Sequence, residues 1–458
     1  MTHTSVTLVI LGATGDLTTR LLLPGLGTLL RNRRAYDVRL IGASNEEISQ
    51  DEWKARVSEA LAEGGCPQDE LSPLLAATHF EVLDVTDQEA LGGFLGRVDE
   101  PGRPTILYFA LPPAVTERAC EAMRGIELPE GLRLALEKPF GSSHESAAAL
   151  NALLTTLVPE EQIFRVDHFL GKATVLNLLG LRFGNRVFEP VWNAANIASV
   201  DIVVDEQLAL EGRAGYYDHA GALVDMIQSH LLLVLAILAM EAPARIDELE
   251  VRDLMAHTLR QVRLWDDDPA TSSRRARYTA GSVEGREIPS YVDEEGVDPA
   301  NETETLAELD VEVRTARWAG VRFRMRSGKA LGGGLRASII HFKDAPYLPE
   351  GFEGGAPSNM LVLGMAPETI QLVVATNGGG NAWNFEMTPL GASLGESMLR
   401  PYGEILEGII TGDPLLSVRG DVAEECWRIV EPVLAAWKAG KVPLEEYEAG
   451  SEGPIAWG

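Results

Sequence analysis

Cysteine and basic residues are scarce in this sequence, and each scarcity excludes a class of protein. Of 458 residues, the three cysteines are Cys66, Cys120 and Cys426. Their number is odd and their spacing fits neither a metal site nor a disulfide framework, so we expect no metal and a reducing cytoplasmic location. Lys and Arg number 39 against 68 Asp and Glu, which gives a formal net charge of −29. That charge argues against nucleic acid or an anionic membrane surface as a partner.

Long apolar runs are also missing. The longest, residues 231–240, is about half of what a bilayer requires and is interpreted as a buried helix segment, so we expect no membrane partner. We find no signal peptide, internal repeat or low-complexity tract. The length exceeds what one hydrophobic core usually serves, and two domains are therefore expected.

A glycine turn near the start carries the first chemical signal. Residues 5–11 are apolar enough for a buried strand and run directly into Gly12-Ala13-Thr14-Gly15-Asp16-Leu17, after which a helix is expected. Such a turn aims free helix amides at a pyrophosphate, and its glycines let the phosphate approach. The spacing is Gly-x-x-Gly rather than Gly-x-Gly-x-x-Gly, so a plain structural turn remains the alternative.

Further short apolar runs alternate with helical segments. Residues 38–41, 105–111 and 133–136 fit strands of a right-handed parallel sheet. The last of these runs ends in Glu137-Lys138-Pro139. A lysine at the carboxyl end of a parallel strand lies where open α/β sheets bind ligands, although an exposed lysine before a turn would look the same.

Residues 165–172 combine a carboxylate, an imidazole and an ammonium group just after a predicted strand. If a helix begins near His168, then His168 and Lys172 lie at i and i+4, where two cationic donors converge on one anion. Asp167 points elsewhere and is free to orient a base from another part of the chain. The alternative is a helix N-cap beside an exposed lysine.

The second half of the chain begins with a predicted strand at 199–205 and a loop at 212–218. Residues 221–240 are apolar nearly all round, which indicates a helix buried on every side. Asp225, Gln228 and His230 stand within this helix and must therefore face a polar network or a ligand. For His230 the alternative is a core histidine whose hydrogen bonds are satisfied.

The remainder is predicted to be mostly strands. We expect residues 265–304 to be acidic loops. Five successive strand-like runs without intervening helices predict an antiparallel sheet, with Lys329 in a turn at its edge. These runs are 321–325, 336–342, 360–365, 369–375 and 381–387, and helices are expected at about 397–411 and 418–438.

Taken in chain order, these motifs resemble the glucose-6-phosphate dehydrogenase family. The resemblance is carried by residues 12–17, 137–141, 165–172, 187–193, 213–230, 326–329 and 450–454, and so covers essentially the whole chain. It implies an α/β plus α+β protein. A Rossmann-type dinucleotide-binding domain, residues 1–172, would precede a larger α+β substrate and dimerisation domain, residues 173–458, with a mainly antiparallel sheet.

The resemblance also implies a reaction and a role for each candidate residue. Glucose 6-phosphate would be oxidised to 6-phosphoglucono-lactone with hydride transfer to NADP or NAD, the first step of the oxidative pentose phosphate pathway, in a homodimer or homotetramer. His230 would be the general base, with Asp167 hydrogen-bonded to it. The implied substrate-binding residues are Lys138, His168, Lys172, Glu206, Asp225 and Lys329. The implied coenzyme-binding residues are Gly12, Ala13, Thr14, Gly15, Asp16, Leu17, Asn45 and Lys138.

Several positions depart from the family pattern. A Lys-Arg-Lys run usual after the glycine turn is reduced to Arg20, and Phe169 replaces a tyrosine. Residues 332–334 are glycines where a basic residue often helps the substrate site. Asn45, followed by Glu46 and Glu47, stands where many NADP-using members have an arginine.

Two other hypotheses stay open from the sequence. One is a sugar dehydrogenase of the glucose-fructose oxidoreductase type, which would leave residues 165–172 and 213–230 unexplained. The other is a non-catalytic paralogue that binds sugar phosphate, suggested by Leu21, Phe169 and the three glycines.

Overall fold

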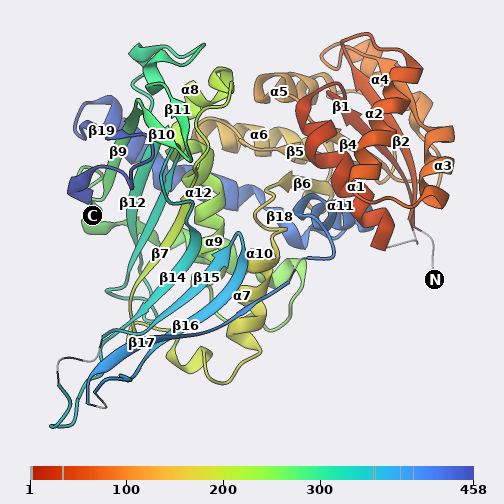
Figure 1. The fold of residues 1–458 in the computed structure, drawn as a ribbon. Helices are drawn as coiled ribbons and strands as arrows, with labels where there is room; N and C mark the ends of the chain where they lie inside the picture. The colour runs from red at the N-terminus through yellow and green to blue at the C-terminus, as the bar shows by residue number, and fades with distance from the viewer. Residues whose placement is uncertain are drawn as a thin grey trace. The chain divides into compact units, whose positions relative to one another are not determined.

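The computed structural model describes residues 4–32, 36–353, 355, 357–381, 383–395 and 397–457. The chain divides into two compact units (Figure 1). The first comprises Met1–Lys172, Pro243–Ala256 and Ser397–Glu425, and the second comprises Ala173–Ala242, His257–Glu396 and Cys426–Gly458. Two stretches far beyond residue 172, Pro243–Ala256 and Ser397–Glu425, therefore belong to the first unit, and we call them the returning stretches.

The first unit is built on a seven-stranded sheet, counted over the described residues, in the order β18-β6-β5-β4-β1-β2-β3. Strands β1 to β6 pair in parallel, and β18 is antiparallel to β6. This arrangement confirms the predicted Rossmann-type sheet. The strands are β1 (Thr4–Leu11), β2 (Tyr36–Ser44), β3 (His79–Val82), β4 (Thr105–Phe109), β5 (Arg133–Glu137), β6 (Ile163–Val166) and β18 (Ser417–Val418).

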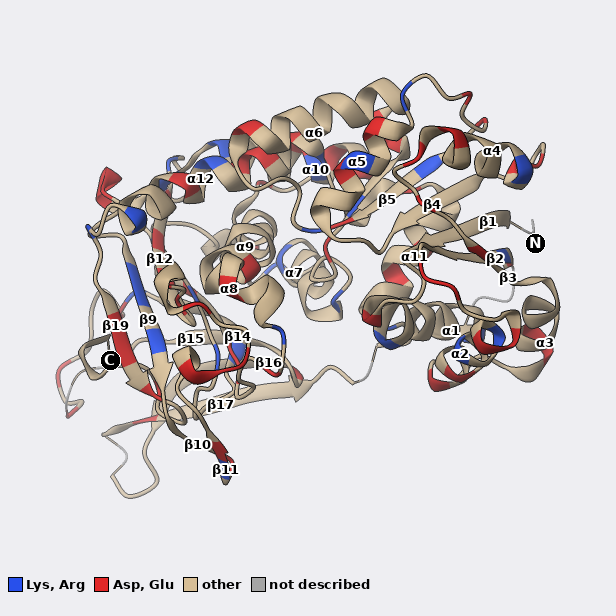
Figure 2. Ribbon diagram, turned by 90° about the horizontal axis from the view of Figure 1, so that it is seen from above, with Lys and Arg blue, Asp and Glu red and all other residues tan. Residues whose placement is uncertain are grey.

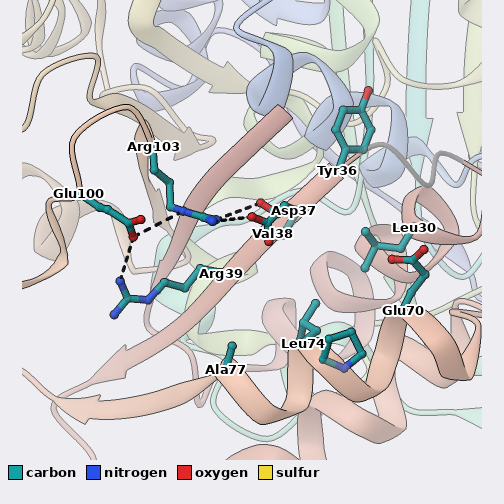
Figure 3. A pocket seen from close by; sticks show the side chains of 11 residues that line it. Leu30, Tyr36, Asp37, Val38, Arg39, Glu70, Leu74, Ala77, Glu100 and Arg103 are labelled. Carbon is teal, nitrogen blue, oxygen red and sulfur yellow. Dashed lines mark hydrogen bonds and ion pairs between the residues drawn. The ribbon is translucent and has the colours of Figure 1, made fainter. Parts of the chain in front are cut away.

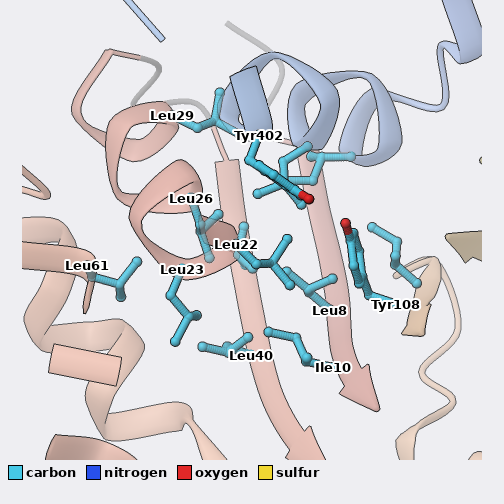
Figure 4. Packing of buried hydrophobic residues seen from close by; sticks show 14 of the residues in the cluster. Leu8, Ile10, Leu22, Leu23, Leu26, Leu29, Leu40, Leu61, Tyr108 and Tyr402 are labelled. Atoms are coloured by element: carbon cyan, nitrogen blue, oxygen red, sulfur yellow. The ribbon is translucent and has the colours of Figure 1, made fainter. Parts of the chain in front are cut away.

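Helices of the first unit bury apolar side chains against this sheet. Leu26 of α1 and Tyr402 of α11 belong to one core cluster with Leu8 and Ile10 of β1 (Figure 4). The helices are η1 (Thr18–Leu22), α1 (Leu23–Asn32), α2 (Gln50–Glu63), α3 (Gln68–Ala77), α4 (Gln88–Val98), α5 (Pro113–Ala122), α6 (His144–Leu157), η2 (Glu160–Gln162), α11 (Pro401–Thr411) and η8 (Pro414–Leu416). Burying α11 in this core fixes one of the two returning stretches on the first unit.

A buried ion-pair network joins the returning stretches to β6. The carboxylate of Glu160 accepts hydrogen bonds from both terminal nitrogens of Arg165 at 2.8 and 3.2 Å, from Arg252 at 3.3 Å and from the amide of Gly420 at 3.1 Å. Arg165 has no exposed surface, and its Nε donates to Asn151 Oδ1 at 2.9 Å. Residues from β6 and from both returning stretches therefore meet at one carboxylate.

The second unit contains a ten-stranded sheet, counted over the described residues, in the order β17-β16-β15-β14-β7-β13-β12-β9-β19, with β8 paired to β12. Its pairs are antiparallel except β7 with β13 and β9 with β19. The strands are β7 (Ile197–Asp205), β8 (Val262–Leu264), β9 (Ser273–Thr279), β12 (Leu306–Val313), β13 (Arg322–Gly328), β14 (Arg336–Phe342), β15 (Met360–Met365), β16 (Glu368–Asn377), β17 (Phe385–Ser393) and β19 (Leu444–Glu448). The mainly antiparallel sheet is as predicted.

The helices of the second unit include a long apolar run. Ala214–Ala239 is long and apolar enough to cross a membrane, but most of it is buried inside the fold, so it is a core helix. The helices are α7 (Ala173–Phe183), η3 (Glu189–Val191), α8 (Ala214–Ala222), η4 (Leu223–Leu231), α9 (Leu232–Ala239), η5 (Trp265–Asp267), η6 (Tyr291–Asp293), η7 (Pro299–Asn301) and η9 (Ile455–Trp457). Helices α10 (Glu248–Arg260) and α12 (Gly420–Lys438) each have residues in both units. Acidic residues are spread over several elements, among them α3, α12 and β19 (Figure 2).

Three sequence expectations about this unit are wrong. The expected loop at 212–218 begins helix α8 at Ala214, because Tyr217 and its neighbours pack into a core of their own. The expected loops at 265–304 contain β9 and a hairpin of β10 (Gly281–Val283) and β11 (Arg286–Ile288). The strand expected at 381–387 is Phe385–Ser393, because it pairs along β16 from Asn377 to Thr369.

Candidate active site

The glycine turn of the first unit has the geometry expected of a phosphate-binding turn. Gly12 has φ +84°, and a Cβ there would lie 2.2 Å from the carbonyl oxygen of Ala110, so only glycine fits. The amides of Gly12 and Ala13 donate to the carbonyl of Ala43, and Gly15 N–H donates to Gly12 O at 3.0 Å. The turn is therefore held to β2 and closed on itself before η1 begins at Thr18.

The carboxyl end of β2 presents acidic rather than basic side chains. Asn45, Glu46 and Glu47 are exposed immediately after Ser44. Arg20 is exposed and paired with Asp16 at 2.9 Å. Sequence reasoning missed Arg56 of α2, whose guanidinium donates to Thr14 O at 3.4 Å and to Glu52 at 2.7 Å. Both arginines near this turn thus have acidic partners.

At the end of β5, Lys138 follows a half-buried carboxylate, that of Glu137. Glu137 accepts a 2.5 Å hydrogen bond from Tyr108 and another from Tyr402. Burial is the largest cause that raises the pKa of Glu137 to about 7, and the two tyrosine hydrogen bonds oppose it. The Lys138–Pro139 peptide bond is cis. Sequence reasoning found Lys138 but missed both tyrosines, because Tyr402 lies about 260 positions away in the sequence.

Residues 168–172 form a turn, not the helix that the i, i+4 argument assumed. The amides of Leu170, Gly171 and Lys172 bond to carbonyls three positions earlier, and α7 begins only at Ala173. The assumed helix fails because a carboxylate intervenes: Asp167 is buried and its Oδ1 accepts the amide of Phe169 at 3.0 Å.

Aromatic rings contact both cations of this turn. The imidazole of His168 stacks on the ring of Tyr402, with centroids 5.9 Å apart and planes 11° apart. The Lys172 ammonium lies 4.1 Å from the centroid of Phe169. The phenylalanine that replaces the family tyrosine therefore offers its π face to the lysine.

In the second unit the structure brings together Glu206 and Lys329, which the sequence separates by more than a hundred residues. Strand β7 pairs in parallel with β13, so both residues follow the carboxyl ends of neighbouring strands, and Lys329 Nζ bonds to Glu206 Oε2 at 2.6 Å. Lys329 is buried, and its ammonium lies 5.2 Å from the centroid of the Tyr217 ring. Residues 326–328 belong to β13 rather than to the expected turn, and β13 is a central strand rather than an edge of the sheet.

The histidine of the apolar helix lies in a stretch of π-helix that the sequence did not predict. Leu223–Leu231 is π-helical, and it carries Asp225, half-buried, and His230, almost fully buried. In a π-helix each hydrogen bond joins residues five positions apart, so residues 225 and 230 lie about one helical turn apart. In an α-helix, with about 3.6 residues per turn, the same two residues would point to different sides. The π-helical register therefore puts both polar side chains on the same side of the helix.

Packing against the C-terminal segment explains the glycine at residue 332. A Cβ on Gly332 would lie 2.2 Å from the carbonyl oxygen of Gly450, and one on Gly333 would lie 3.1 Å from a carboxylate oxygen of Glu452. A side chain at residue 332 would therefore collide with the backbone of Gly450, whereas residue 333 has only the flexible side chain of Glu452 beside it.

A pocket of about 210 Å³ at the start of β2 lies at the opposite end of the parallel strands from the glycine turn (Figure 3). Its charges pair among themselves: Arg103 contacts Asp37 at 2.5 Å and Glu100 at 3.5 Å, and Arg39 contacts Glu100 at 3.7 Å. Ligands of open parallel sheets bind at the carboxyl ends of strands, so this pocket is not part of the candidate site.

Comparisons with known proteins agree over the whole chain. The family described as "Glucose-6-phosphate dehydrogenase, NAD binding domain" matches residues 9–177, and "Glucose-6-phosphate dehydrogenase, C-terminal domain" matches residues 179–457. The glucose-6-phosphate 1-dehydrogenase of Treponema pallidum (strain Nichols) is 38% identical over 98% of this chain and 92% of its own length. The Gluconobacter oxydans (strain 621H) enzyme is 39% identical over 97% and 94%.

Solved structures give the same result. A glucose-6-phosphate dehydrogenase in complex with glucose 6-phosphate has a TM-score of 0.88 at 29% identity, over 100% of this chain and 97% of that one. A levoglucosan dehydrogenase has a TM-score of 0.52 at 12% identity, over 97% of this chain and 100% of that one, which shows a shared fold only. This chain belongs to the glucose-6-phosphate dehydrogenase family.

Proposed function

We propose that this protein oxidises glucose 6-phosphate at its anomeric carbon to the lactone, as the first step of the oxidative pentose phosphate pathway. The match of both family domains along the chain is the observation that carries this proposal. The candidate residues Lys138, Asp167 and His230 are all in place. A nicotinamide dinucleotide, NADP or NAD, supplies the hydride acceptor.

His230 takes the proton of the anomeric hydroxyl in this proposal. Departure of a hydride leaves positive charge on the anomeric carbon unless the hydroxyl proton leaves as well, so the base acts on the barrier itself. Asp167 orients the imidazole and stabilises its protonated form. Asp225 and Glu206 hold sugar hydroxyls, and the 2.6 Å ion pair fixes Lys329 beside Glu206.

His168, Lys172 and Lys138 supply the positive charge for the substrate phosphate and the coenzyme. Three consecutive backbone hydrogen bonds close the turn at 168–172, and both His168 and Lys172 contact an aromatic ring. A preorganised local cluster of cations allows a dianion to bind a protein whose net charge is −29.

The glycine turn accommodates the pyrophosphate of the dinucleotide. Gly12 and Ala13 already donate their amides to Ala43, so the residues that follow, Thr14, Asp16 and Leu17, are the ones whose amides reach the phosphates. Asn45 contacts the adenosine ribose at the end of β2.

We propose further that the protein associates with itself through the end of its ten-stranded sheet. Strand β17 is the terminal strand of that sheet, and Leu390 on it is 56% exposed. An uncapped edge strand with apolar side chains is suited to a second copy of the same surface, which gives a homodimer or, by repetition, a homotetramer. A cytoplasmic location fits the three free cysteines, all buried.

A turnover assay with glucose, glucose 6-phosphate, other hexoses and their 6-phosphates tests the reaction and the coenzyme together. We expect turnover with glucose 6-phosphate and either a preference for NAD or weak discrimination in favour of NADP. A 2′-phosphate beside Glu46 and Glu47 is repelled, while a ribose hydroxyl donates to a carboxylate. A preference for NADP of about a hundredfold or more, which equals about 2.7 kcal/mol, contradicts this expectation.

The same assay separates the alternative functions. Binding without turnover of any of these sugars would indicate the non-catalytic paralogue. Turnover of unphosphorylated sugars alone would indicate the sugar dehydrogenase of the glucose-fructose oxidoreductase type.

Lys172→Ala should raise KM for glucose 6-phosphate with a smaller change in kcat. Loss of one charge-assisted contact to phosphate costs about 1.5 to 3 kcal/mol, or roughly ten- to a hundredfold in affinity. Unphosphorylated glucose is the internal control, because its KM should not change. An unchanged KM for glucose 6-phosphate would place the phosphate elsewhere.

His230→Asn and Asp167→Asn should fail in different ways. Loss of a general base lowers kcat by about a hundred- to ten-thousandfold with little change in substrate affinity. Asp167→Asn should cost less and move the acidic limb of the pH–rate profile to lower pH, because the carboxylate stabilises the protonated imidazole. Turnover, substrate affinity and thermal midpoint are measured on both variants. A His230→Asn protein that melts earlier but turns over within about tenfold of wild type would make His230 a packing residue.

A further inference from the structure

The helix that carries Asp225 and His230 begins at a break in the backbone. Helix α8 ends and the π-helix η4 begins around Gly221, whose φ of +65° and ψ of 177° are not helical. A Cβ on Gly221 would lie 2.3 Å from Oε1, 2.6 Å from Cδ and 2.6 Å from Oε2 of Glu304. The whole carboxyl group of Glu304 therefore occupies the space that any other side chain at residue 221 would need.

Glu304 accepts amides that the start of a helix leaves without partners. Glu304 Oε1 accepts the amide of Leu223 at 2.9 Å. The carbonyl oxygen of Glu304 accepts Ala222 N–H at 3.3 Å as well. The partial positive charge at the amino end of the helix offsets part of the cost of burying a negative charge here.

Glu304 is buried, and charged or titratable groups approach it from several elements. Tyr217 comes from α8, Arg275 from β9, and Tyr291 from η6, and Asp218 of α8 lines the same cavity as Glu304. This cavity beside the break is also lined by His219, Glu302 and Lys438. Burial is the largest cause that raises the pKa of Glu304 to about 7, while the amides and Arg275 oppose the rise. The group therefore changes charge in the neutral range.

We propose that Glu304 is a positioning residue: its carboxylate caps the catalytic helix and fixes the side chains of Asp225 and His230 relative to the substrate. This inference rests on the proposed function, in which His230 is the base and Asp225 a sugar ligand. In this proposal Glu304 affects turnover through the backbone of Leu223, whose amide its carboxylate accepts.

The carboxylate form should hold the helix better than the protonated form, because charge-assisted hydrogen bonds are about twice as strong as neutral ones. We therefore expect kcat to rise as Glu304 loses its proton around pH 7, in addition to the pH dependence that His230 causes. Stability changes in the opposite direction. Because the pKa is raised on folding, Glu304 favours the folded state at low pH, and this contribution is lost as the pH rises through about 7.

The experiment compares Glu304→Gln with wild type from pH 6 to pH 8. Gln keeps the shape and one acceptor but cannot carry charge. We expect kcat of wild type to exceed that of the variant by about three- to tenfold at pH 8, with a ratio that approaches one at pH 6. The titration of His230 affects both proteins equally and cancels in the ratio. The thermal midpoint of the variant at pH 8 should equal or exceed that of wild type.

Glu308→Gln is the matched control. Glu308 lies on β12, its pKa is also raised by burial, and it pairs with Arg326 at 3.3 Å rather than with the catalytic helix. Its kcat ratio to wild type should not depend on pH.

Each outcome decides between positioning and packing. A Glu304→Gln ratio of one at every pH, a loss that is the same at every pH, or a lower thermal midpoint at pH 8 would overturn the inference. The role of His230 as the base is tested separately. If His230 is not the base, the His230→Asn variant keeps its turnover, whether or not Glu304→Gln changes kcat.

Discussion

The ion-pair network around Glu160 is the interaction that holds the candidate residues at the end of β6 in the first unit. A fully buried guanidinium such as that of Arg165 costs several kcal/mol unless it is paired, and Glu160 supplies the pair. The same carboxylate also bonds Arg252 and the amide of Gly420. Two distant stretches of chain are thereby fixed beside β6, from whose end Asp167 and His168 extend. One of these stretches contains Tyr402, on which His168 stacks.

Two other carboxylates, half-buried Glu137 and buried Glu304, act in the same way near the candidate catalytic residues. Glu137 joins Tyr108 of β4 to Tyr402 of α11 next to Lys138, and Glu304, just before β12, accepts an amide of the helix that carries His230. Burial raises the pKa of each to about 7. In so acidic a chain most carboxylates are solvated, and these few instead determine where the backbone and the cations lie.

Features that depend on local sequence patterns could be predicted from the sequence, whereas features that depend on residues far apart in the chain could not. The parallel sheet, the glycine turn and Lys138 at the end of β5 follow from apolar runs and turn residues, and they were predicted. The π-helical register around His230 depends on packing all round the helix and on a cap from Glu304, which lies in a region predicted to be loop. The helix expected at His168 was wrong because Asp167 bonds the backbone of Phe169 instead. Helix propensity alone does not predict that a side chain will take a backbone hydrogen bond in this way.

A crystal structure with glucose 6-phosphate bound tests the account most directly, because it shows which residues contact each end of the substrate. The account predicts that the phosphate contacts His168 and Lys172 and that the anomeric hydroxyl lies within hydrogen-bond distance of the His230 imidazole. A phosphate bound at other cations, or an anomeric carbon remote from His230, would contradict it.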